Sequence, residues 1–138
     1  MRVVLDAHVV ASRVLAPHGP AAALFAAWEL GALDFAVSED VLAEYERLLA
    51  DPAIRSYPGL EYEDVSGLVD GFRRLGVLVE PDGYSSSCDD AGQAYFDCAR
   101  ASGSEVVFAG NRRLQALHDR DGIAVLAPSA FMALVAIT

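Results

Sequence analysis

The feature that most constrains the fold is a regular alternation of short apolar runs with helical patterns. The apolar runs, rich in valine, leucine and phenylalanine, cover residues 2–5, 33–37, 77–80, 105–109 and 123–126. Segments with helical spacing separate them, at residues 20–30, 38–50, 61–75 and 87–102, with a short one ending near residue 117 and a last one from residue 128. Strands that alternate with helices pair in parallel and are covered on both faces. The sequence therefore predicts an α/β fold, a three-layer α/β/α sandwich with a parallel sheet of about five strands.

The length predicts one domain, spanning residues 1–138. A chain of this size buries enough surface to fold without cross-links, and it contains no internal repeat or low-complexity linker. Hydrophobic residues make up 54% and charged residues 22%, which is typical of a globular protein. The two cysteines, Cys88 and Cys98, match neither a disulfide framework nor a common zinc spacing.

No segment has the pattern of a signal peptide or of a membrane span. The longest apolar tract, residues 20–37, is interrupted by Glu29, Gly31 and Asp34. We therefore expect a cytoplasmic protein with no membrane association.

The charge balance excludes several function classes. Twenty acidic residues oppose ten basic ones, for a net charge of -10. The protein therefore lacks the broad positive surface that attracts nucleic-acid phosphate groups. All ten basic residues are arginine. Without lysine there is neither a P-loop nor a Schiff-base enzyme, and the chain has no dinucleotide-binding glycine motif or nucleophile elbow.

Polar residues follow the predicted strands where a parallel sheet binds its ligands, at the carboxyl ends. Asp6 and His8 follow the first strand, Asn111 follows the fourth, and Glu44 lies two turns into the helix after the second strand. Carboxylates that converge from separate elements, with no lysine to neutralise them, favour a hard divalent cation such as magnesium or manganese. Such a cation would also let an acidic protein approach RNA locally.

Several segments resemble the PIN domain family. They are residues 6–9 (Asp-Ala-His-Val), 16–20, 38–46, 108–111 and 127–131. More narrowly, the chain is similar to the bacterial toxin-like, VapC-type subfamily. The resemblance implies a magnesium- or manganese-dependent endoribonuclease with strand order 3-2-1-4-5. It also implies a homodimer, paired with a cognate antitoxin protein as the toxin component of a toxin–antitoxin system.

The resemblance implies a metal site with one altered position. Asp6 matches the first family acid and Glu44 the second. Counting eighteen residues back from the residue at the fourth position places the third family acid at Gln93, which carries no charge. Asp97 lies one helical turn later and Asp90 about one turn earlier. The implied metal ligands are Asp6, Glu44 and Asp97, with Asp90 as the alternative to Asp97.

Further site residues come from the same comparison. Asn111 stands at the fourth family position and completes the catalytic set of Asp6, Glu44, Asp97 and Asn111. The predicted substrate-binding residues are His8, Gln93 and Arg112. Three of these residues have structural alternatives: His8 as a packed histidine, Arg112 as a solvated arginine and Asn111 as the N-cap of the next helix. Gln93 would line the site as a neutral substitute for the family acid.

The acidic candidates have alternatives of the same kind. Asp6 could cap a helix, although burial of a charge is costly without a partner. Glu44 could pair with Arg47, and Asp97 with Arg100, each at i+3. If Asp6 is a metal ligand only, Asp6→Asn should abolish metal binding and activity while folding stays intact.

A second hypothesis is a catalytically impaired PIN-like domain that acts as a protein-interaction module. Its support is the combined change at Ala7, His8, Gln93 and Ala109 relative to the family pattern. Such a domain could hold a partner on an apolar helix face, for example that of residues 20–30.

Overall fold

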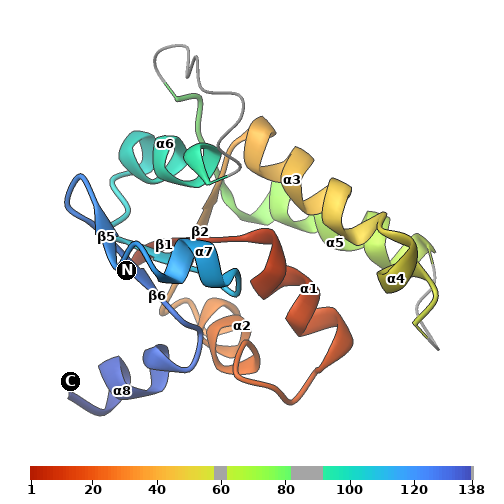
Figure 1. The fold of residues 1–138 in the computed structure, drawn as a ribbon, viewed down its shortest axis with the longest axis horizontal. Helices are drawn as coiled ribbons and strands as arrows, with labels where there is room; N and C mark the ends of the chain where they lie inside the picture. Colours follow the sequence, from red (N-terminus) through yellow and green to blue (C-terminus); the bar gives the residue numbers. More distant parts are fainter. Residues whose placement is uncertain (58–61, 82–91, 138) are drawn as a thin grey trace.

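The computed structural model describes residues 1–57, 62–81 and 92–137, and its centre is a six-stranded sheet (Figure 1). The strands are β1 (Arg2–Leu5), β2 (Asp34–Val37), β3 (Val77–Leu78), β4 (Val106–Phe108), β5 (Asp119–Arg120) and β6 (Ile123–Leu126). They lie in the order β3-β2-β1-β4-β6-β5, and every pairing is parallel except that of β5 with β6. The predicted fold class and the predicted order of the five parallel strands are confirmed.

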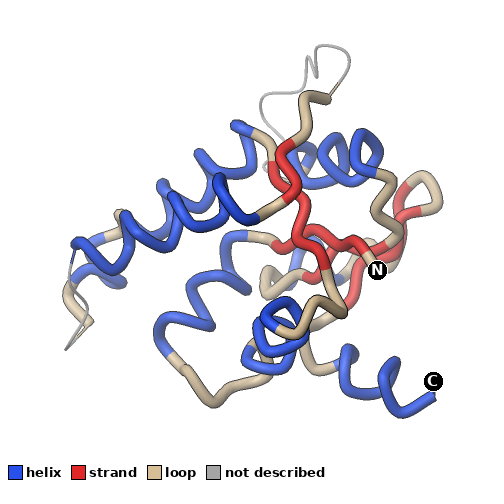
Figure 2. The backbone as a smooth tube through the Cα atoms, turned by 180° about the vertical axis from the view of Figure 1, so that it is seen from behind, coloured by secondary structure: helices blue, strands red, loops and turns tan. Residues whose placement is uncertain are grey.

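Helices lie on both sides of this sheet. They are α1 (Ala7–Leu15), α2 (Ala22–Glu29), α3 (Glu39–Leu49), α4 (Pro52–Arg55), α5 (Tyr62–Leu75), α6 (Gln93–Ser102), α7 (Arg112–Gln115) and α8 (Ala130–Ile137). In Figure 1, α3, α5 and α6 lie on one side and α2 and α8 on the other. The view from behind shows the same layers, with the strands between them (Figure 2). Among the helices that the structure describes, none combines the length and apolar character needed to cross a bilayer.

Three elements were not predicted from the sequence: α1, the single-turn α4, which Asp51 caps, and β5. Helix α1 begins directly after β1, because the Asp6 side chain accepts a hydrogen bond from the Val9 amide and caps the first turn. Strand β5 forms a hairpin with β6 through a two-residue loop, Asp121 and Gly122. Both loop residues have positive φ, 53° and 83°, as a type I′ turn requires. The Asp-Gly pair is a recognised signal for such a hairpin.

One further difference concerns α6. Its predicted start at Ser87, with Asp90 in its first turn, lies outside the described residues, and so does Cys88. The described helix begins at Gln93. Of the three positions considered for the third family acid, the structure therefore describes two, Gln93 and Asp97.

An aromatic cluster fills the core beside β2. Phe25, Trp28, Phe35 and Phe72 pack together, with the rings of Trp28 and Phe72 stacked at 5.5 Å between centroids. Tyr45 of α3 lies against Phe72 and is fully buried. Its hydroxyl donates a 2.7 Å hydrogen bond to the Leu5 carbonyl. This bond ties α3 to the carboxyl end of β1, where the candidate site lies.

Candidate functional site

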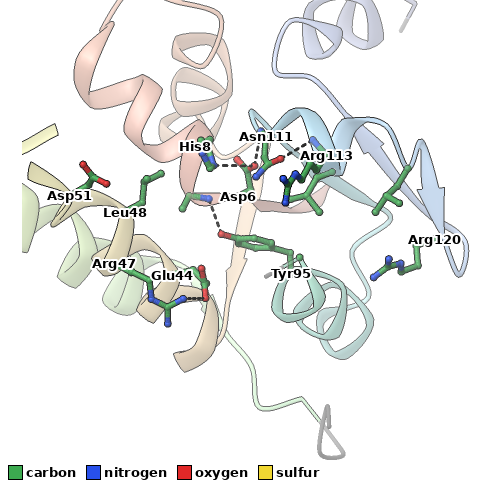
Figure 3. Close-up of a pocket in the computed structure, with 14 residues that line it drawn as sticks. Asp6, His8, Glu44, Arg47, Leu48, Asp51, Tyr95, Asn111, Arg113 and Arg120 are labelled. Carbon is green, nitrogen blue, oxygen red and sulfur yellow. Dashed lines mark hydrogen bonds and ion pairs between the residues drawn. The ribbon is translucent and has the colours of Figure 1, made fainter. Parts of the chain in front are cut away.

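A pocket of about 630 Å³ opens at the carboxyl ends of β1 and β4 (Figure 3). Residues that line it come from the β1–α1 junction, from α3, α6 and α7, and from β5. Its polar lining includes Asp6, His8, Glu44, Arg47, Asp51, Tyr95, Asn111, Arg113 and Arg120. The pocket therefore brings together two of the three predicted metal ligands, and it mixes carboxylates with arginines.

Asp6 is buried and held by the backbone. Its carboxylate accepts hydrogen bonds from the amides of Val9, Gly110 and Asn111, at 2.8 to 3.1 Å. Burial nevertheless raises the pKa of the carboxyl group, and these amide donors and nearby His8 only partly oppose that effect. The Nδ1 atom of His8 lies 4.0 Å from the carboxylate, on a side chain that is half exposed. Asp6 thus joins the carboxyl ends of β1 and β4, and its negative charge is not fully compensated.

Close packing at this junction depends on a glycine. A Cβ atom on Gly110 would lie 2.9 Å from Cβ of His8, which is too close for ordinary packing. The absence of a side chain lets the Gly110 amide approach the Asp6 carboxylate.

Glu44 reaches the pocket from α3. Its side chain is 21% exposed and forms an ion pair with Arg47 at 2.7 Å, as the structural alternative predicted. The pair is exposed enough for solvent to weaken it, so it contributes little to stability. Glu44 therefore lies in the pocket wall, with one oxygen paired to an arginine.

Tyr95 of α6 is a site residue that the sequence did not indicate. Its hydroxyl accepts a 3.0 Å hydrogen bond from the Ala7 amide, and Figure 3 shows it between Asp6 and Glu44. Burial raises the pKa of Tyr95, and the charges of Asp6 and Glu44 raise it further. The Tyr95 hydroxyl therefore keeps its proton. An aromatic residue on a buried helix face carries no sequence signal for such a role.

Gln93 and Asp97 interact with each other and do not line the pocket. The Gln93 Nε2 atom donates to Oδ1 of Asp97 at 2.8 Å, and Arg100 donates to the same oxygen. Asp97 thus has the arginine contact that its structural alternative predicted. Asp90, the other candidate for the third acid, lies outside the described residues.

Asn111 and the arginines define the opposite wall. The Asn111 side chain accepts a 2.8 Å hydrogen bond from the Arg113 amide and caps α7, as its structural alternative predicted. Arg113 and Arg120 line the pocket, whereas Arg112 does not. The sequence predicted Arg112 as a substrate-binding residue, but its neighbour Arg113 lines the pocket instead.

The comparison with protein families gives one match. A family model described as the PIN domain matches residues 2–113. The chain belongs to the PIN domain family. Neither the curated proteins nor the solved structures give a match. PIN domains are generally nucleases and typically use divalent metal ions, and the matched region contains the residues that line the pocket except Leu114, Leu117 and Arg120.

The pocket of this PIN domain fits a divalent cation through two carboxylates. Asp6 and Glu44 both line it, and the raised pKa of Asp6 reports a buried negative charge that a cation would neutralise. Magnesium is commonly held by one or two carboxylates together with water and substrate phosphate. Within residues 1–57, 62–81 and 92–137, no group of three or more acidic, histidine or cysteine side chains is placed to hold an ion. The described residues therefore suit a cation shared with substrate better than a closed, all-protein metal site.

Proposed function

We propose that this PIN domain is a magnesium- or manganese-dependent endoribonuclease. One observation carries the proposal: Asp6 and Glu44, from separate elements, line the same pocket, which the Tyr95 side chain also lines. Membership of a family that is generally nucleolytic supports the reaction class. Hydrolysis of an RNA phosphodiester is the reaction that this pocket supports best.

The roles of the residues follow from their surroundings. Asp6 and Glu44 would hold the cation, which when bound supplies Lewis-acid activation of the phosphodiester and of water. The amides of Val9, Gly110 and Asn111 fix the orientation of the Asp6 carboxylate. The Tyr45 hydrogen bond to Leu5 fixes α3, and so Glu44, relative to Asp6. Tyr95 retains its proton and presents an O–H donor between the two carboxylates.

The biological role we propose is that of a toxin of the VapC type, neutralised by a cognate antitoxin. The resemblance of residues 6–9 and 38–46 to that subfamily supports this role.

We also propose that residues 1–138 form one cytoplasmic domain that assembles as a homodimer. The apolar helix α8, which exposes Met132 and Leu134, is consistent with such assembly. Growth arrest on expression, with rescue by a co-expressed antitoxin, is the test of the toxin role.

The enzymatic proposal is tested by cleavage of a labelled single-stranded oligoribonucleotide in manganese. The wild-type protein should cleave the RNA, EDTA should stop the reaction, and Glu44→Gln should slow it about 100-fold. Glu46→Gln, an acid on the same helix outside the pocket lining, is the matched control and should retain the wild-type rate. Equal rates for the wild-type and Glu44→Gln proteins would contradict the proposal.

A second candidate is a PIN-like domain that has lost catalysis and serves as an interaction module. The observation that favours it is the neutral Gln93 at the third acid position, together with the pairing of Asp97 to Arg100. This candidate predicts no cleavage in manganese by the wild-type protein. Capture of a defined protein partner without metal would then distinguish it.

A further inference from the structure

The interactions of Gln93 extend from α6 to the pocket wall. Its side-chain oxygen accepts a 3.2 Å hydrogen bond from Arg120 of β5, while its amide nitrogen donates to Asp97. Asp97 in turn pairs with Arg100. Gln93 thus connects an arginine that lines the pocket to a carboxylate whose charge is already balanced.

Two more contacts hold Arg120 in place. Its guanidinium lies 4.8 Å from the centroid of the Phe96 ring, within the range of a cation–π interaction. Arg100 also pairs with Asp121 at 3.1 Å, which ties the turn of the β5–β6 hairpin to α6. Arg120 is half-buried and is positioned by a ring, an amide and a fixed turn. A side chain held in this way loses less conformational entropy when it binds a ligand.

The chemistry of this wall favours a phosphate group. Arg120 and Arg113 both line the pocket, on the wall opposite Glu44. Guanidinium groups bind phosphate through paired, charge-assisted hydrogen bonds. Because Gln93 is neutral, it holds Arg120 without cancelling its charge. A carboxylate at that position would pair with Arg120 and weaken its attraction for an anion.

The dimensions of the pocket restrict the ligand. A volume of about 630 Å³ accommodates a nucleotide-sized group but not a double helix. The net charge of -10 also requires the phosphate contacts to be local. We propose that Arg120, positioned by Gln93 and supported by Arg113, binds a backbone phosphate of single-stranded RNA without the help of a metal ion. The inference rests on the proposed function for its ligand but not on catalysis.

The test is fluorescence anisotropy of a labelled single-stranded oligoribonucleotide in EDTA, where metal-dependent cleavage cannot occur. Arg120→Ala should weaken binding about tenfold and reduce the slope of log K against log salt by about 0.7. Arg74→Ala, which removes the same charge from exposed α5 outside the pocket lining, is the matched control and should change binding less than twofold. Thermal unfolding of each variant confirms that it is folded.

Gln93 is tested as a positioning residue by a double-mutant cycle. Gln93→Ala should weaken RNA binding about threefold in the wild-type background and have no further effect in the Arg120→Ala background. A purely structural role would give the same loss in both. Gln93→Glu should weaken binding in EDTA as well, because the new carboxylate pairs with Arg120.

The outcomes separate this inference from the proposed function. Binding in EDTA that depends on Arg120, without cleavage in manganese, would support the inference and contradict the nuclease. Cleavage that depends on Glu44, with binding unaffected by Arg120→Ala, would support the nuclease and overturn the inference. Absence of any RNA binding in EDTA, or an equal loss for Arg74→Ala and Arg120→Ala, would also overturn it.

Discussion

The β1–α1 junction and helix α6 both carry an aspartate close to the pocket, but they treat its charge differently. Asp6 at the junction is buried and accepts hydrogen bonds from three backbone amides, with His8 4.0 Å away. Asp97 on α6 is 19% exposed and is paired with Arg100. The first carboxylate has no ion pair with an arginine among the described residues, whereas the second shares Arg100 with Asp121.

Position relative to the pocket separates the candidate ligands. Asp97 does not line the pocket whereas Glu44 does, although each is paired with an arginine. Asp6 lines the pocket and is buried with a raised pKa, so a cation would stabilise its charged form. Family spacing places the missing third acid near α6, but the contacts there hold Arg120 rather than an ion. In our proposals, α6 therefore supports phosphate binding, and Asp6 and Glu44 hold the cation.

The largest effect is expected for Asp6→Asn. The amide NH₂ of asparagine cannot accept hydrogen bonds, so either the Val9 amide, which donates to Oδ1, or the Asn111 amide, which donates to Oδ2, would lose its acceptor. We expect loss of RNA cleavage and a decrease of about 1–3 kcal/mol in the free energy of unfolding, measured by urea denaturation. This differs from the expectation of intact folding that the sequence alone suggested. Unchanged stability would contradict the backbone role of Asp6.

Glu44→Gln separates function from stability. The ion pair of Glu44 with Arg47 is half open to solvent and contributes less than about 1 kcal/mol. We therefore expect manganese affinity to fall by about tenfold or more, while the urea midpoint stays near that of the wild type. A large loss of stability would mean that Glu44 is structural.

The pH dependence of stability tests whether the pKa of buried Asp6 is raised. Because burial raises the pKa of Asp6 above 3.8, the folded state binds its proton more tightly than the unfolded state does. The Asp6 contribution to stability is therefore greatest below pH 3.8 and declines as pH rises through the folded-state pKa. The stability difference between wild-type and Asp6→Asn proteins, measured by urea denaturation without metal, should shrink from acidic to neutral pH. A constant difference would contradict a raised pKa.

The smallest effect is expected for Asp97→Asn. It removes one exposed ion pair and leaves an oxygen that can still accept from Gln93. Stability should fall by less than about 1 kcal/mol, and RNA cleavage should stay within twofold of the wild type. Thermal unfolding and the RNA cleavage assay together check this result. A loss of cleavage comparable to that of Glu44→Gln would restore Asp97 as a ligand.

The sequence predicted the sheet well because its strands are continuous apolar runs between helical patterns. It missed α1, since residues 7–15 carry few signals beyond the Asp6 cap. It also missed β5, although Asp121 and Gly122 form a turn that the Asp-Gly signal indicates. The single-turn helix α4 was missed as well. Local patterns therefore determined most elements, and each missed element is very short or has only a cap or a turn as its strong signal.

The candidate site was predictable where strand ends fixed it. Asp6 and Asn111 follow β1 and β4, so parallel pairing brings them together. Tyr95 and Arg120 could not be found in the same way. Tyr95 faces the pocket only because α6 packs beside β1, and Arg120 reaches it through the missed hairpin. Both depend on tertiary packing, which sequence spacing does not contain.

Calorimetric titration of the metal-free protein with manganese tests the central claim most directly. We predict saturable binding that Glu44→Gln weakens about tenfold or more and Asp97→Asn leaves within twofold of the wild type. Equal weakening by both substitutions would place Asp97 in the metal site. Absence of binding at millimolar manganese would contradict a cation held by Asp6 and Glu44.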